Sequence, residues 1–409
     1  PVTAILTPNG QPIWMDVFVD KGRLIKTLKR LQAIWRTQPR SLQQIAKNIS
    51  LSTQSTSISM SDIEWSETIL RNQLTQWRSY LDSENGGLKG SPKFLESPLL
   101  TLLLLEYQHN QSPELKTILI TWLDNLYQSP IRDQVLGGFH RYASDTNWQS
   151  PHFEKMLYNQ AQLISVYVLA ARTLDNPEYF SVARDTLLFT EKYLGALDGD
   201  FYAAIDADYT GLEGGFYTFS DLQKRTLEQN GETLWKKVDE RWLPSQLTIS
   251  NEIQRKAYAT ERLKRPLPHT DKKLITGWNG LMLSAYSELF EYTGNDAYLI
   301  KAEKLANTIL TKNMAVNGLA KAVYMDNATG KADLADYAYL SEGLLKLFNI
   351  TNNRYYLNEA RGLADTAFKR IEVNNTLGTI KDEEIPSALV KLFDSYEYIQ
   401  KLQLTPLAQ

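Results

Sequence analysis

The sequence predicts a mainly helical protein. A small N-terminal β-hairpin and helix come first in the chain, and about six helical hairpins that close into an (α/α)6 toroid follow. From Asp62 onward, apolar residues recur at helical spacing, and few convincing strands exceed four residues. Glycine-containing loops also recur, at successive intervals of 51, 62, 118 and 60 residues. These loops begin at Asn85, Leu136, Asp198, Val316 and Thr376.

Each repeat reads as a pair of helices joined by a small β-ribbon and followed by an inner helix. Units of this length cannot bury their apolar faces alone, so they must stack or close on each other. The interval of 118 residues is close to two of the others, which suggests that one loop has lost its glycine, near the segment HTDKKLITGWNG that starts at His269. A linear α-solenoid is the alternative to a closed ring. Closure is favoured because the glycine loops all precede inner-type helices and would therefore collect at one rim.

The N-terminal elements differ from the rest of the chain. Residues 1–20 read as two short strands around a turn at Pro8-Asn9-Gly10. Residues 21–50 have apolar residues at helical spacing, and the Ser/Thr-rich residues 51–61 read as a linker. The predicted organisation is therefore 1–50 for a β-hairpin and helix, 51–61 for a linker, and 62–405 for the six-hairpin barrel.

Composition excludes several classes of function. A net charge of -3 and a pI near 6.0 give no electrostatic footprint for nucleic acid or for an anionic membrane. No apolar run is long enough to span a bilayer, and no signal peptide is recognisable at residue 1. The chain has no cysteine, which excludes disulfides and thiolate zinc sites within it. It also lacks HExxH and a phosphate-binding loop, so we expect no metal and no cofactor.

The segment from Gly137 to Leu169 is the most informative stretch of the sequence. Ser150 and Pro151 read as the cap and first residue of a long helix, which would place His152 and Glu154 in its first turn, near the positive end of the helix dipole. His140 and Arg141 precede this helix in a short alternating run.

Closure of the ring would bring four polar clusters to one rim. Taken singly, each residue has a structural explanation: Asp336 as a helix cap, Asp206 and Asp208 as acceptors for loop backbone, and Glu154 as a charge opposite the helix dipole. As a set, the carboxylates, the arginine and the aromatic residues have the chemistry that a carbohydrate pocket needs. The clusters comprise Lys93; His140, Arg141, His152 and Glu154; Asp206, Asp208 and Glu213 with Asp271, Lys272, Trp278 and Asn279; and Asp333, Asp336 and Tyr337.

Two reactions are open at such a rim. Glycoside hydrolysis needs one protonated and one ionised carboxyl group, and Glu154 with Asp208 or Asp336 is the preferred pair. Isomerisation or epimerisation needs a base beside a carbonyl group, for which His152 or His140 is best placed. Glu154, His152, Asp208 and Asp336 are therefore the catalytic candidates. The expected substrate-binding residues are Lys93, His140, Arg141, Asp206, Trp278, Asn279 and Tyr337.

Four ordered segments carry a resemblance to a known family. Residues 137–163 (GGFHRYASDTNWQSPHFEKMLYNQAQL), 206–219 (DADYTGLEGGFYTF), 271–283 (DKKLITGWNGLML) and 334–345 (LADYAYLSEGLL) resemble the signature segments of the spermatogenesis-associated, thioredoxin-domain-containing proteins. The resemblance runs from residue 1 to about residue 345 and implies a cytoplasmic protein. It also implies a thioredoxin-like domain followed by a barrel like that of the N-acylglucosamine 2-epimerases and six-hairpin glycosidases.

The resemblance also sets the functional alternatives. Pro1-Val2-Thr3 looks like the thioredoxin cis-proline segment, while the cysteine-containing half of that domain is absent from this sequence, so a missing half or a redox partner is expected. The later hairpins offer Trp278, Asn279, Asp336 and Tyr337 but none of the histidines that epimerases of this fold use there. We therefore expect a carbohydrate-active or carbohydrate-binding barrel with a sugar-like ligand. The alternative is a non-catalytic interaction or chaperone-like module partnered with a thioredoxin-like domain, and whether the barrel is an enzyme is left open.

Overall fold

The computed structural model describes residues 3–16, 19, 21–53, 79–230, 233–238, 240–246, 252–315 and 318–374. The chain divides into two compact units, Pro1–Glu64 with Arg370–Asp382 and Trp65–Lys369 with Glu383–Gln409. Most of the expected linker, the start of the barrel at residue 62 and the final hairpin expected after residue 375 lie outside the described residues.

The first unit is a β-hairpin packed on two helices. Strands β1 (Thr3–Leu6) and β2 (Pro12–Asp16) pair antiparallel around the turn predicted at residues 8–10. Helices α1 (Lys21–Thr37) and α2 (Pro39–Thr53) follow, so α2 extends three residues into the stretch expected to be a linker. The core is small: Ile13 of β2 packs against Leu42 and Ala46 of α2.

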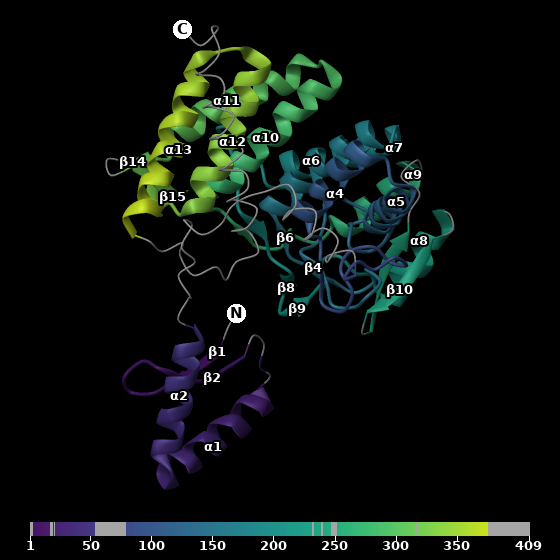
Figure 1. Cartoon of the computed structure of the whole chain (residues 1–409). Coiled ribbons are helices and arrows are strands. Elements are labelled where there is room, and N and C mark those ends of the chain that lie inside the picture. The colour runs from purple at the N-terminus through teal and green to yellow at the C-terminus, as the bar shows by residue number, and fades with distance from the viewer. Residues whose placement is uncertain are drawn as a thin grey trace. The chain divides into compact units, whose positions relative to one another are not determined.

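The second unit is built from pairs of helices, as the glycine repeat predicts. The described part holds four pairs: α4 (Ser97–Asn110) with α5 (Pro113–Gln128), α6 (Leu157–Thr173) with α7 (Pro177–Tyr193), α10 (Thr276–Thr293) with α11 (Asp296–Lys312), and α12 (Leu334–Thr351) with α13 (Arg354–Asn374). The first helices of the pairs pack on each other in the order α4, α6, α10, α12 (Figure 1).

Burial separates the inner helices from the outer ones. Twelve residues of α10 are buried, whereas α11 buries only one stripe, Ala302, Leu305, Ala306 and Ile309. Helices α10 and α12 approach backbone to backbone, because a Cβ on Gly280 would lie 2.7 Å from the Leu340 nitrogen and one on Gly343 would lie 2.7 Å from the Gly280 oxygen. The mainly helical toroid expected from the sequence is confirmed.

Short strands lie before each described inner helix and join neighbouring repeats at the rim. Strands β3 (Lys93–Phe94), β4 (Tyr142–Ala143) and β5 (Pro151–His152) form one sheet, and β6 (Lys155–Met156), β7 (Ala204–Ile205) and β12 (Thr270–Asp271) form a second. A third contains β13 (Leu274–Ile275), β14 (Met314–Ala315), β15 (Gly318–Tyr324) and β16 (Asn327–Lys331). Strands from different repeats therefore pair with each other along the rim.

The expectation that a glycine loop was lost near residue 269 is wrong. Strand β12 pairs with β7, with Thr270 opposite Ile205, and the Asp206 nitrogen donates to the His269 oxygen at 2.8 Å. Residues 206–269 are therefore one excursion from a single connection. It contains β8 (Asp208–Tyr209), β9 (Leu212–Glu213), α8 (Asp221–Leu227), β10 (Leu234–Val238), β11 (Arg241–Gln246) and α9 (Glu252–Arg262). The long interval is thus one repeat plus an insertion.

A buried ionic cluster fixes this excursion to the rim loop. Asp133 accepts hydrogen bonds from Arg262 at 2.7 Å and from Lys155 at 2.9 Å, and all three residues are buried. Lys155 also donates to the Gly137 oxygen at 2.7 Å, and its Nζ lies 4.1 Å from the centre of the Phe189 ring. Burial raises the pKa of Asp133, but the two cations outweigh it and hold that pKa well below its usual range.

No helix in the described part of the chain is long and apolar enough to cross a membrane.

Candidate functional site

The long inner helix begins six residues later than the sequence suggests. Pro151 and His152 form β5, with His152 opposite Tyr142, and the Arg141 nitrogen donates to the Glu154 oxygen at 2.9 Å. Helix α6 starts only at Leu157. The predicted place of His152 and Glu154 in a first helical turn is therefore wrong, because pairing with neighbouring strands satisfies this backbone in an extended form.

The extended form still brings the two side chains together. Residues two apart in an extended segment point to the same side, and His152 Nε2 lies 3.8 Å from Glu154 Oε2. On its other nitrogen, His152 Nδ1 lies 2.6 Å from Glu213 Oε1 of β9. His152 therefore lies between two carboxylates that come from different parts of the chain.

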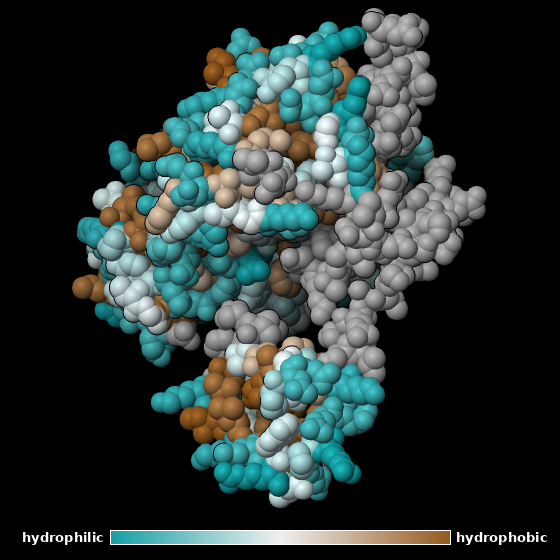
Figure 2. All heavy atoms as spheres, turned by 90° about the vertical axis from the view of Figure 1, so that its left-hand side faces the viewer, coloured by the Kyte–Doolittle hydropathy of each residue, from teal (hydrophilic) through white to brown (hydrophobic). Residues whose placement is uncertain are grey.

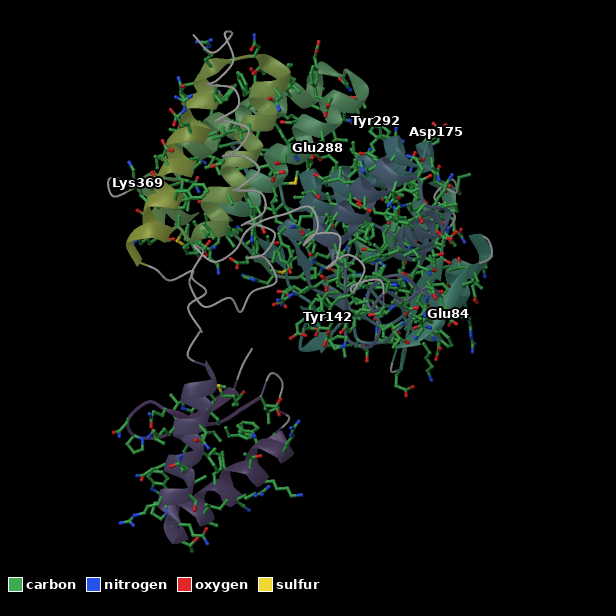
Figure 3. All side chains as sticks on the ribbon, viewed as in Figure 1. Glu84, Tyr142, Asp175, Glu288, Tyr292 and Lys369 are labelled. Carbon is green, nitrogen blue, oxygen red and sulfur yellow. The ribbon has the colours of Figure 1, made fainter. Side chains whose placement is uncertain are left out.

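Arg141 and three aromatic residues complete this group, which we call the His152 cluster (Arg141, Tyr142, His152, Glu154, Tyr158, Glu213 and Trp278). Arg141 Nη1 donates to Glu154 Oε2 at 3.0 Å. Tyr142 stacks on the His152 ring at 4.8 Å, and Tyr158 lies 5.0 Å from Trp278, measured between ring centres. Tyr142 lies at the end of the unit that carries the short strands, and Glu288 and Tyr292 lie at the other end (Figure 3).

The cluster has a defined charge state near neutral pH. The nearby carboxylates of Glu154 and Glu213 raise the pKa of His152 to about 9, although burial opposes this. In return, His152 lowers the pKa of Glu154 and of Glu213. The imidazole is therefore protonated and both carboxylates are ionised. The four polar side chains remain reachable, since 25 to 50% of each is exposed.

Asp206 and Asp208 lie beside the cluster but on exposed backbone. Asp206 Oδ1 accepts a hydrogen bond from the Asp208 nitrogen at 3.1 Å. Asp208 is the strand partner of Glu213, in the β8–β9 hairpin. Asp206 thus accepts a hydrogen bond from the loop backbone, which is the structural role considered for it from the sequence. Asp208 lies opposite Glu213, the residue that contacts His152.

Three other candidates are buried and engaged with the protein itself. Lys93 Nζ lies 2.6 Å from both Asp82 Oδ2 and the Gly86 oxygen. His140 Nδ1 contacts the Phe153 oxygen at 3.0 Å, and burial holds its pKa well below its usual value, so the ring is neutral. Asn279 brackets the Phe201 backbone, with Oδ1 accepting from its nitrogen at 2.8 Å and Nδ2 donating to its oxygen at 3.1 Å. These contacts give each residue a structural role.

Asp336 also acts within the fold. It is fully buried at the third position of α12, where Oδ1 accepts from the Gly277 nitrogen at 2.9 Å and Oδ2 accepts from the Asp333 nitrogen at 3.0 Å. Asp333, rather than Asp336, is the cap of the helix, and the two form a capping box. Asp336 therefore ties the start of α12 to the start of α10, and the neighbouring Tyr337 is buried as well.

Several residues of importance were missed from the sequence. Tyr142 and Tyr158 were not among the candidates, although they flank His152 and Arg141 in the motif itself. Asp133 and Arg262 are 129 residues apart, so local spacing in the sequence could not predict that Arg262 donates to both oxygens of the Asp133 carboxylate. The burial of Lys155 could not be predicted from periodicity either, because helical and strand patterns indicate only where apolar residues are buried.

The fold and rim define the class to which this protein is similar: helical toroids of six hairpins. Among solved structures, cellobiose 2-epimerase from Spirochaeta thermophila DSM 6192 aligns with a TM-score of 0.55 at 14% identity, over 81% of this chain and 81% of that one. A family 76 glycoside hydrolase from a bovine Bacteroides thetaiotaomicron strain aligns with a TM-score of 0.53 at 14% identity, over 82% of this chain and 64% of that one. These likenesses concern the fold.

The sequence relatives are more specific. Spermatogenesis-associated protein 20 of Homo sapiens is 27% identical over 447 residues, which cover 90% of this chain and 57% of that protein. Uncharacterized protein B0495.5 of Caenorhabditis elegans is 27% identical over 434 residues, covering 88% and 59%. The chain thus spans less than two thirds of the length of these relatives. No family model matches the chain. The expected likeness to the spermatogenesis-associated proteins and to the toroid fold is confirmed, and a thioredoxin-like domain stays a prediction.

Proposed function

We propose that the His152 cluster is a carbohydrate site and that the barrel is a sugar-modifying enzyme of the epimerase or isomerase type. The observation that carries this proposal is the position of a protonated imidazole between two ionised carboxylates, on a partly exposed rim ribbon. The fold shared with a cellobiose 2-epimerase and a family 76 glycoside hydrolase is consistent with it.

The cluster has the groups that a sugar requires for binding. Glu154 and Glu213 accept hydrogen bonds from hydroxyl groups, and Arg141 donates to ring or hydroxyl oxygens. The Trp278 and Tyr158 rings supply apolar surface for the C–H face of a pyranose or for an open-chain sugar. A neutral mono- or disaccharide fits this balance of charge, since the two cations and two carboxylates offset each other.

Proton transfer suits these charge states better than hydrolysis does. A glycoside hydrolase needs a carboxyl group that holds its proton, whereas the pKa of Glu154 and that of Glu213 are both lowered. In an isomerisation, Glu154 would take the proton from the carbon beside the carbonyl group, and His152 would give one to the carbonyl oxygen. Glu154 then gives its proton to the neighbouring carbon or to the other face of the first carbon, while His152 takes a proton from an enediol hydroxyl group, so that both residues regain their starting protonation states.

The experiment is incubation with a panel of reducing mono- and disaccharides in deuterium oxide, followed by proton NMR. Epimerisation or isomerisation replaces the proton beside the carbonyl carbon with deuterium. We expect exchange with at least one sugar, and loss of exchange in Glu154→Gln and His152→Gln. Asp208→Asn is the matched control, because its carboxylate is exposed on the same rim. A broad panel without exchange, and without binding by calorimetry, would remove the proposal.

A second function is favoured by a separate observation in the N-terminal unit. One face of the β1–β2 hairpin packs on α2 through Ile13, but the opposite face carries Leu6 and Met15, which are 52% and 45% exposed. Figure 2 shows apolar side chains gathered on one side of this unit. An exposed apolar sheet face of this kind is typical of a docking surface. This favours the alternative of an interaction module that is partnered with a thioredoxin-like domain.

The test of the second function is calorimetric titration of this chain with a separately produced thioredoxin-like domain. Binding that is weakened by Leu6→Ser with Met15→Ser, and unchanged by Glu154→Gln, would support a module that works through the hairpin face. Absence of binding, or binding that ignores the hairpin substitutions, would refute it.

A further inference from the structure

A surface hollow lies on the outer side of the helical unit, apart from the side chains of the His152 cluster. It is formed between α7, α9 and the loop at residues 135–136, and its volume is about 270 Å³. That is slightly below the roughly 300 Å³ at which typical small-molecule pockets begin, so an occupant must be small. Its aliphatic and phenyl lining comes from Val135, Leu136, Leu188, Phe189 and Ala259.

The wall of this α7–α9 hollow is held by a fixed ion-pair network. Arg255 Nη1 lies 2.6 Å from Asp185 Oδ1, and the buried Arg132 also pairs with this carboxylate. Arg255 Nε donates to the Val135 oxygen at 3.1 Å. Burial raises the pKa of Asp185, but the two arginines outweigh it and lower that pKa. Asp185 is therefore fully used by the protein, and the wall keeps its shape without a ligand.

Positive charge is left over at the edge of the hollow. Lys192 of α7 and Lys256 of α9 line it and are exposed, and neither has an ion pair in the described part of the chain. Lys192 Nζ lies 5.1 Å from the centre of the Tyr193 ring. The buried hydroxyl group of Tyr193, which also lines the hollow, has no hydrogen-bond partner among the described residues. Glu252, one helical turn before Lys256, offsets part of this charge.

We infer that the α7–α9 hollow binds a small organic anion with an apolar body, of the aromatic or short aliphatic carboxylate class. The apolar lining removes the body from water, and the two exposed lysines attract the carboxylate. A neutral molecule of the same shape gains only the first of these contributions. The inference does not depend on the carbohydrate proposal, since no residue of the His152 cluster lines the hollow.

The test is isothermal titration of the whole chain with 2-naphthoate, benzoate and the neutral analogue 2-naphthalenemethanol. We expect one site for 2-naphthoate, with at least about tenfold weaker binding of the neutral analogue. Lys192→Glu with Lys256→Glu weakens 2-naphthoate binding by about tenfold or more, because attraction becomes repulsion. Ala259→Phe fills the hollow and also weakens binding.

Two matched controls separate this site from others. Lys116→Glu reverses an exposed lysine on α5 and leaves binding unchanged. Leu6→Ser alters the apolar hairpin face of the other unit and also leaves binding unchanged. Circular dichroism and the unfolding midpoint verify that each variant is folded. The inference is overturned if 2-naphthoate does not bind at millimolar concentration. It is also overturned if binding survives both the double charge reversal and Ala259→Phe.

Discussion

Asp336 provides a direct test of whether a rim carboxylate is structural. It is fully buried and accepts hydrogen bonds from the Gly277 and Asp333 backbone nitrogens, while Lys321 Nζ lies 3.2 Å away. In Asp336→Ala the buried Gly277 N–H and the partly buried Asp333 N–H lose their acceptor. A buried orphaned donor costs about 1–3 kcal/mol and a partly buried one costs less, so the free energy of unfolding should fall by about 2–5 kcal/mol. Asp336→Asn keeps one acceptor and should lose about 1–3 kcal/mol.

The assay is urea unfolding followed by tryptophan fluorescence, with the slope of the transition compared between variants. Asp208→Asn is the control, because a substitution on the exposed rim away from such bonds should change the free energy of unfolding by less than about 0.5 kcal/mol. If Asp336→Ala unfolds within about 0.5 kcal/mol of the wild type, the structural account is refuted. If Asp336→Asn keeps its stability but loses sugar exchange, the catalytic role considered from the sequence is restored.

Four further predictions concern protonation and packing. Burial raises the pKa of Asp336 from 3.8 to about 7, so its contribution to stability is complete below pH 3.8 and is lost as pH rises through 7. The difference in the free energy of unfolding between the wild type and Asp336→Asn should therefore shrink between pH 5 and pH 8 in the same urea assay. The His152 ring should titrate near pH 9 by NMR, and Glu213→Gln should lower this value toward 6.5. Asp133→Ala strands two buried cations and should cost about 3–5 kcal/mol in thermal or urea unfolding, with a smaller loss refuting the buried cluster. Gly280→Ala should cost about 1–2 kcal/mol, because its methyl group meets backbone of α12, while Gly362→Ala, with nothing within 4 Å, should be neutral or stabilising.

The repeat of glycine loops indicated the toroid, although it did not reveal that residues 206–269 are an insertion. Each such loop marks a ribbon before an inner helix, and Gly86 shows why the residue type matters. It has φ of +73°, and a Cβ there would lie 2.3 Å from the Trp122 Cα. A constraint of this kind is visible in sequence because only one residue satisfies it. The apolar residues predicted the helices because each inner helix buries most of its side chains and is therefore rich in apolar residues along its whole length.

The same reasoning failed where a local signal competed with a contact between distant segments. Ser150-Pro151 has the composition of a helix start, yet Pro151–His152 pairs with Tyr142–Ala143 and Lys155–Met156 pairs with Ala204–Ile205, so the helix begins only at Leu157. The stronger signal is a contact between segments, which local spacing does not encode. The partner of His152 shows this again, because Glu213 is 61 residues away and meets it only through the β8–β9 hairpin.

The pairing of Ile205 with Thr270 has a consequence for how this chain can vary. Since those two positions are already neighbours, a tight turn between them would leave the ring's path uninterrupted, and residues 206–269 are a natural place for sequence to be gained or lost over time. Arg262 limits that freedom, because it neutralises Asp133 from inside the removable piece. A homologue that has shed the piece would therefore leave Asp133 paired with Lys155 alone.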